Sequence, residues 1–165
     1  ADVSLVNSPA ENAAKAYQSE VDAIHTYEPF ASEALAKGGH VLSTSSDTPN
    51  LMLGAMTFPV ALVESRPQDI QGFADAWFKA VDWMYANPDQ VPAIVAKAFG
   101  VPAEYVWSGG DKVFTRAEAV ALMQPGNDYS SAYFVTQQYI DFLVTTGSLA
   151  SKPDVNILID PSFLK

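Results

Sequence analysis

The sequence of 165 residues contains no cysteine, so it can form neither disulfide bonds nor a thiolate metal site. It also lacks an uninterrupted run of about 18 apolar residues, which a membrane-spanning helix requires. Basic residues are few: 9 Lys and Arg stand against 19 Asp and Glu, for a net charge of −10. Because nucleic acids and anionic membranes bind basic faces, neither is expected as a partner.

Several catalytic signatures are missing as well. There is no HExxH metal motif, no Walker-type glycine loop, no GxSxG nucleophile turn and no Asp/Glu/His cluster at metal spacing. The residues therefore predict a binding protein rather than an enzyme, with no cofactor. The opening residues ADVSLV lack the basic segment and long apolar core of a signal peptide, so any export signal is expected outside this chain.

The first 50 residues alternate between strand-like and helix-like segments. Residues 2–7, 21–24 and 40–43 are predicted as short strands. Ser8, Pro9 and Glu11 form a capping-box pattern before one helix, and a second helix is predicted from Pro29 to about Lys37, ended by two glycines. This order is typical of parallel α/β units, which place ligand sites beyond the carboxyl ends of their strands.

After residue 50 the predicted character becomes helical. Residues 45–50 are predicted as a turn or linker and residues 51–58 as a long apolar strand. Capped helices are predicted after Ser65 and Thr115. Further helices are predicted from Asn87–Pro88 to Gly100, with Pro92 marking a kink or the true start, and from 128 to about 146, ended by Gly147. One apolar face is expected on the helix after Ser65, formed by Ile70, Phe73, Ala74, Trp77, Phe78, Val81 and Met84.

The stretch VDAIHTYEPF, residues 21–30, is the main candidate site. It passes from a predicted strand into a predicted helix, where Glu28 is either a ligand contact or only a residue that favours the helix dipole. Tyr27 and Phe30 either wall a pocket or belong to the core. His25 is a polar candidate at the same strand end, with a locally satisfied histidine as the alternative. Asn7 occupies the equivalent position after the first predicted strand.

Four segments together resemble a known family. In their order along the chain they are similar to the solute-binding proteins of ABC importers for nitrate, sulfonates, taurine, bicarbonate and thiamine precursors. The segments are AYQSEVDAIHTYEPFASEALAKGGHVLSTS, RPQDIQGFADAWFKAVDWMYANPDQVPAIVAKAFGV, YIDFLVTTGSL and LIDPSFL. The resemblance implies an α/β fold of the type II periplasmic-binding-protein class, here incomplete. Residues 1–50 would be the distal part of the second lobe, 51–58 a crossover strand, and 59–165 a helical return over the first lobe.

This resemblance implies a role for each candidate residue. The acid of the family's aromatic–acid–Pro motif faces the interlobe cleft, so Glu28 is expected to meet a donor or cationic group of a small organic solute. Thr26 and Tyr27 are expected to form the wall, while His25 and Asn7 complete the candidate set. A zwitterion such as an aminosulfonate, or an aminopyrimidine, fits better than nitrate. The family usually has a glycine at the turn occupied here by Ser19–Glu20, so a deletion or sequence uncertainty is expected there.

The resemblance also implies partners and a location. A complete receptor has two lobes and about 300 residues, so the N-terminal half of the same receptor is an expected partner, together with the ABC permease membrane subunits. The expected location is periplasmic or extracytoplasmic. Three alternatives stay open: an enzyme of the thiamine-pyrimidine synthase type, a sensory or interaction module, and a truncated fragment that does not bind ligand by itself.

Overall fold

The computed structural model describes residues 3–106 and 112–165. These residues divide into two compact units. The first unit combines the described parts of 1–43 and 87–111, and the second combines 44–86 with 112–165. The candidate residues 7 and 25–28 all lie in the first unit.

The first unit contains three α-helices and two 3-10 helices. They are α1 (Ala10–Ala16), α2 (Phe30–Ala36), η2 (Pro88–Gln90), α5 (Val91–Phe99) and η3 (Ala103–Tyr105). α1 packs on α2, with Ala14 and Ala34 buried between short helices that carry few large side chains. The Lys37 ammonium donates to the Ala14 carbonyl oxygen at 2.6 Å, which joins the end of α2 to α1. α5 packs on η2 and η3.

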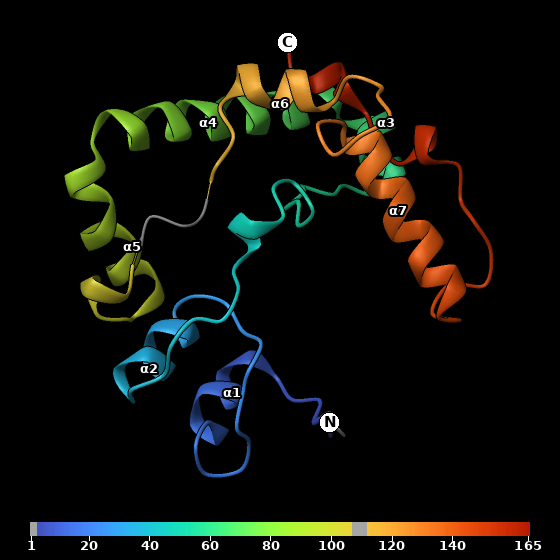
Figure 1. The fold of residues 1–165 in the computed structure, drawn as a ribbon. Helices are drawn as coiled ribbons and strands as arrows, with labels where there is room; N and C mark the ends of the chain where they lie inside the picture. Colours follow the sequence, from blue (N-terminus) through green and yellow to red (C-terminus); the bar gives the residue numbers. More distant parts are fainter. Residues whose placement is uncertain (1–2, 107–111) are drawn as a thin grey trace. The chain divides into compact units, whose positions relative to one another are not determined.

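The second unit is built around its longest helix. Its elements are η1 (Ser45–Asp47), α3 (Val60–Ser65), α4 (Pro67–Ala86), α6 (Arg116–Leu122), α7 (Ala132–Thr145), η4 (Val155–Ile157) and η5 (Pro161–Phe163). α6 lies along α4, and the C-terminal segment joins them (Figure 1): Arg116 pairs with Asp75 of α4 and donates to the Lys165 carbonyl oxygen. Gln71 of α4 also donates to the Phe163 carbonyl oxygen at 3.3 Å.

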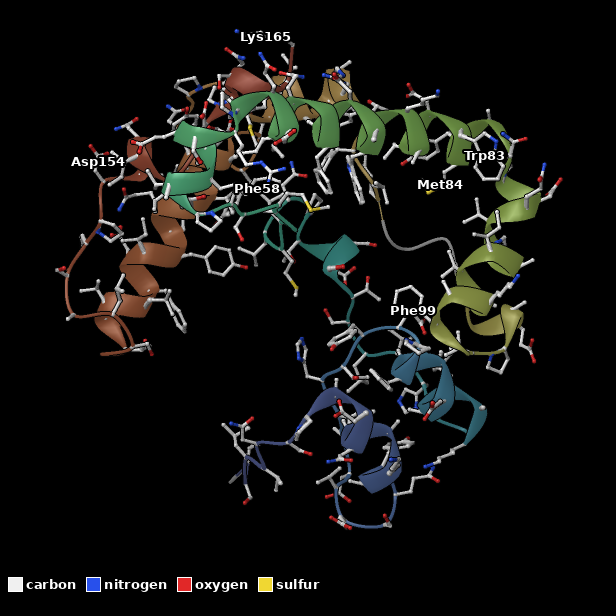
Figure 2. All side chains as sticks on the ribbon, turned by 180° about the vertical axis from the view of Figure 1, so that it is seen from behind. Phe58, Trp83, Met84, Phe99, Asp154 and Lys165 are labelled. Carbon is white, nitrogen blue, oxygen red and sulfur yellow. The ribbon has the colours of Figure 1, made fainter. Side chains whose placement is uncertain are left out.

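The buried side chains of this unit come mainly from α4 and α7. They are Ile70, Phe78 and Val81 of α4, Ala132, Val135 and Ile140 of α7, and Ser131 just before α7. Phe58, labelled in Figure 2, packs edge-to-face on Phe73 with ring centroids 5.6 Å apart. The predicted apolar face of α4 is therefore only partly a core, because Phe73 and Trp77 remain 45% and 39% exposed.

Two hydrogen bonds connect residues 50–51 to α7 and to the segment just before it. The Asn50 amide donates to the Tyr129 carbonyl oxygen at 3.0 Å, and the Tyr139 hydroxyl donates to the Leu51 carbonyl oxygen at 2.7 Å. Asn50 has a positive φ of 60°, which an asparagine adopts more readily than most residues. The predicted turn at 45–50 is confirmed and contains η1.

The predicted strands are absent from the described residues. Residues 3–7, 21–24, 40–43 and 51–58 belong to no strand, and the β-bridge in the described part of the chain joins Tyr17 to Val21. Asp2, the first residue of the first predicted strand, lies outside those residues. A strand forms only when a neighbouring strand pairs with its N–H and C=O groups. Apart from the single bridge at Val21, no such pairing is present in the described part of the chain. The predicted crossover strand at 51–58 is consequently an irregular segment followed by the unpredicted helix α3.

Most predicted helix ends are confirmed. Gly38, Gly100 and Gly147 follow α2, α5 and α7 with φ of 87°, 69° and 74°, a backbone region that glycine enters without steric cost. The capping box at the start of α6 is also present: the Thr115 N–H donates to Glu118 Oε2 at 2.9 Å, and the Glu118 N–H donates to Thr115 Oγ1 at 3.4 Å. Pro92 lies in the first turn of α5 and so marks its true start.

Two predicted caps are wrong. Pro9, not Ser8, is the N-cap of α1, because the Asn12 and Ala13 N–H groups both donate to the Pro9 carbonyl oxygen. Ser65 is the last residue of α3 and donates back to the Ala61 carbonyl oxygen, so it does not cap α4. The last long helix begins at residue 132 instead of 128, after an Asp128–Ser130 turn.

Candidate functional site

The candidate site is the turn formed by residues 25–30 at the start of α2. Pro29 is the N-cap of α2, and the Glu28–Pro29 peptide bond is cis. The carbonyl oxygens of Tyr27 and Pro29 accept the first helical hydrogen bonds, from the N–H groups of Ala31 at 3.1 Å and Glu33 at 3.2 Å. Four of the five predicted site residues therefore lie in one continuous turn at a helix entry.

Glu28 is half-buried and binds the helix that follows it. Its Oε2 accepts a hydrogen bond from the Ser32 N–H at 3.1 Å, which satisfies one of the N–H groups that have no partner in the first turn of any helix. A carboxylate has about four acceptor positions on two oxygens. Within the described part of the chain Oε1 accepts no hydrogen bond, so that oxygen keeps its capacity for a donor.

The aromatic residues of the turn contact each other. Tyr27 and Phe30 meet edge-to-face, with ring centroids 5.8 Å apart and an interplanar angle of 72°. Phe30 is half-buried, whereas Tyr27 is 66% exposed. Most of the Tyr27 side chain is therefore open to solvent in the same turn that carries Glu28, as an aromatic wall would require.

Thr26 carries an unusual polar atom. Its Oγ1 is buried and has no hydrogen-bond partner among the residues that the structure describes. A buried hydroxyl without a partner costs about 1–3 kcal/mol, so such atoms are rare in folded proteins. Together with Glu28 Oε1, this hydroxyl gives the turn two polar atoms with unused hydrogen-bonding capacity.

The other two predicted residues contribute less to this arrangement. His25 is exposed at the start of the turn. Asn7 is exposed in the irregular segment before α1, and no hydrogen bond or ion pair joins it to the turn in residues 3–106 and 112–165. The structure thus keeps residues 25–28 together and does not link Asn7 to them.

Sequence reasoning missed Ser32 as the partner of Glu28. The spacing alone does not reveal this bond, because a capping side chain ordinarily belongs to the N-cap residue, whereas Glu28 stands one residue before the N-cap Pro29. Among the described residues, no group of three or more His, Asp or Glu side chains is arranged to hold a metal ion. No described helix combines the length and the apolar character needed to cross a membrane.

Comparison with known proteins gives one match. The family model of the NMT1-like family matches residues 1–100, which cover well over half of the 165 residues and include the whole candidate turn. No curated protein and no solved structure gives a significant match. The match supports, at the level of the family, the resemblance drawn from the sequence. The chain therefore belongs to the NMT1-like family.

Proposed function

We propose that this chain forms part of an extracytoplasmic solute-binding receptor of an ABC importer, which binds a small organic solute of the sulfonate or taurine class. The observation that carries the proposal is the NMT1-like match over residues 1–100, because it contains the turn with Glu28 and Tyr27. The proposed fold is of the periplasmic-binding-protein type II class, with this chain supplying a portion of two lobes. Binding occurs by hinge closure around the solute, without chemistry.

The turn at 25–30 suits a solute with a cationic or donor end. Glu28 is anchored through Oε2, so Oε1 is held in place at little further entropic cost when a ligand arrives. An ammonium or amidine N–H meeting this oxygen makes a charge-assisted hydrogen bond, which is about twice as strong as a neutral one. Tyr27 would cover the apolar part of the same ligand.

The proposal includes two protein partners. The N-terminal half of the same receptor would close the cleft from the other side and hold the acidic end of the ligand. The permease subunits of the importer would then bind the closed form at the extracytoplasmic face of the membrane that holds them. The net charge of −10 is compatible with both, since neither interaction requires a basic face on the whole protein.

The test is calorimetric titration of the intact receptor with taurine, methanesulfonate and nitrate. Taurine is expected to bind most tightly, because it alone of the three carries an ammonium group. Glu28→Gln should weaken taurine binding about ten- to hundredfold, as expected for loss of a charged hydrogen bond of about 1.5–3 kcal/mol. The same substitution should leave methanesulfonate binding unchanged.

Two further variants separate ligand binding from helix capping. Glu28→Gln keeps an oxygen that can accept from the Ser32 N–H, so its helical circular dichroism and melting temperature should match the parent protein, whereas Glu28→Ala should lose both the cap and the ligand contact. Glu33→Gln removes a carboxylate from the same first turn and should bind taurine normally. Equal taurine affinity for Glu28→Gln and the parent would refute the assigned role of Glu28, and no binding of any solute would refute the receptor itself.

A further inference from the structure

We draw no further inference here: the strongest candidate, the exposed apolar patch that Phe142 and Leu143 form on α7, carries nothing because no contact in the described part of the chain shows what covers it.

Discussion

Gly39 occupies a position that has no room for a methyl group. A Cβ placed there would lie 2.9 Å from the Ala34 carbonyl oxygen and 3.2 Å from Cε1 of Tyr17. The Ala34 oxygen belongs to the backbone and cannot rotate away as a side chain could. The chain leaving α2 would therefore have to move away from this oxygen to make room for the methyl group. The glycine thus allows residues 17 and 39 to approach closely in the small α1–α2 unit.

Gly39→Ala is therefore expected to destabilise the protein by about 1–3 kcal/mol, the usual cost of forcing an extra methyl group into a closely packed site. Urea unfolding followed by circular dichroism would measure this loss. An unchanged unfolding midpoint would contradict the close approach of Gly39 to Ala34.

Gly72 provides the matched comparison for the same chemical change. It lies inside α4, and a Cβ there would meet nothing within 4 Å. Because glycine in a helix interior is less favourable than alanine by about 0.5–1 kcal/mol, Gly72→Ala should raise the unfolding midpoint in the same urea experiment. Opposite shifts for the two glycines would show that local space, not glycine content, decides the outcome.

At the scale of single elements, the start of α6 combines a capping box with an ion pair. The Lys112 Nζ lies 2.8 Å from Glu118 Oε1, while the backbone and hydroxyl of Thr115 bind Oε2. These contacts lower the pKa of Glu118 from its ordinary 4.5 to about 2. The hydrogen bond from Lys112 is the largest cause, and those from Thr115 follow. The same pair raises the pKa of Lys112.

This lowered pKa has a defined consequence for stability. A carboxylate whose pKa is lower in the folded state contributes stability above its unfolded pKa and loses it as the pH falls through the folded value. The contribution of Glu118 should therefore be complete above pH 4.5 and disappear by about pH 2. Glu118→Gln should show a smaller loss of stability between those pH values when both proteins are unfolded in urea at each pH.

Some pH dependence will remain in that variant. Arg116 lowers the pKa of Asp75, and Lys152 lowers the pKa of Asp141, so both carboxylates contribute in the same direction.

Thr115→Ala removes the other half of the capping box and should cost about 1 kcal/mol at neutral pH. Identical acid unfolding of Glu118→Gln and the parent would contradict the role of the ion pair.

Arg116 joins three parts of the second unit. Its guanidinium pairs with Asp75 at 2.6 Å, lies over the Phe78 ring at 4.7 Å and donates to the Lys165 carbonyl oxygen. Arg116→Ala should lower the melting temperature by about 2–4 °C, which corresponds to about 1 kcal/mol for a chain of this size.

Asp75→Asn separates the ion pair from the other two contacts of Arg116. This variant keeps the ring contact and the bond to Lys165, so it should lower the melting temperature less than Arg116→Ala does. Differential scanning calorimetry at one salt concentration measures both variants. Equal losses would mean that the ring and carbonyl contacts contribute nothing.

At the scale of the whole molecule, an acidic charge accompanies many exposed apolar side chains. Leu5 is 91% exposed and Phe99, labelled in Figure 2, is 75% exposed, while the net charge at neutral pH is −10. Charge repulsion between copies opposes association through such side chains at pH 7 and vanishes near the isoelectric point. Light scattering should therefore rise towards a maximum near pH 4.3.

Salt provides the control for this prediction. Added NaCl at pH 7 shortens the Debye length from about 10 Å at 0.1 M to about 3 Å at 1 M, so it should also increase scattering. Scattering that is independent of both pH and salt would show that charge does not limit association of this protein.

Local signals in the sequence were enough for much of the helical architecture and for the family. Several helix-boundary signals involve contacts within one helical turn, so their predicted roles do not depend on distant residues. They are the glycines at 38, 100 and 147, the Thr115–Glu118 capping box and Pro92. The position of Glu28 at a helix entry was also readable from neighbouring residues. Its bond to the Ser32 N–H was not, because the sequence does not say which atoms of the turn face the helix.

What the sequence by itself determined is therefore the glycine-ended helix C-termini and the Thr115–Glu118 cap, the acidic character and the membership of the NMT1-like family. Tertiary structure alone decided the state of the segments predicted as strands, because the described residues 3–7, 21–24, 40–43 and 51–58 form no strand in the fold. The physical reason is that a helix satisfies its backbone hydrogen bonds within its own segment, whereas a strand depends on a partner elsewhere. How far Thr26, Tyr27 and Glu28 are buried was likewise decided by the folded turn, because burial depends on which residues pack around it.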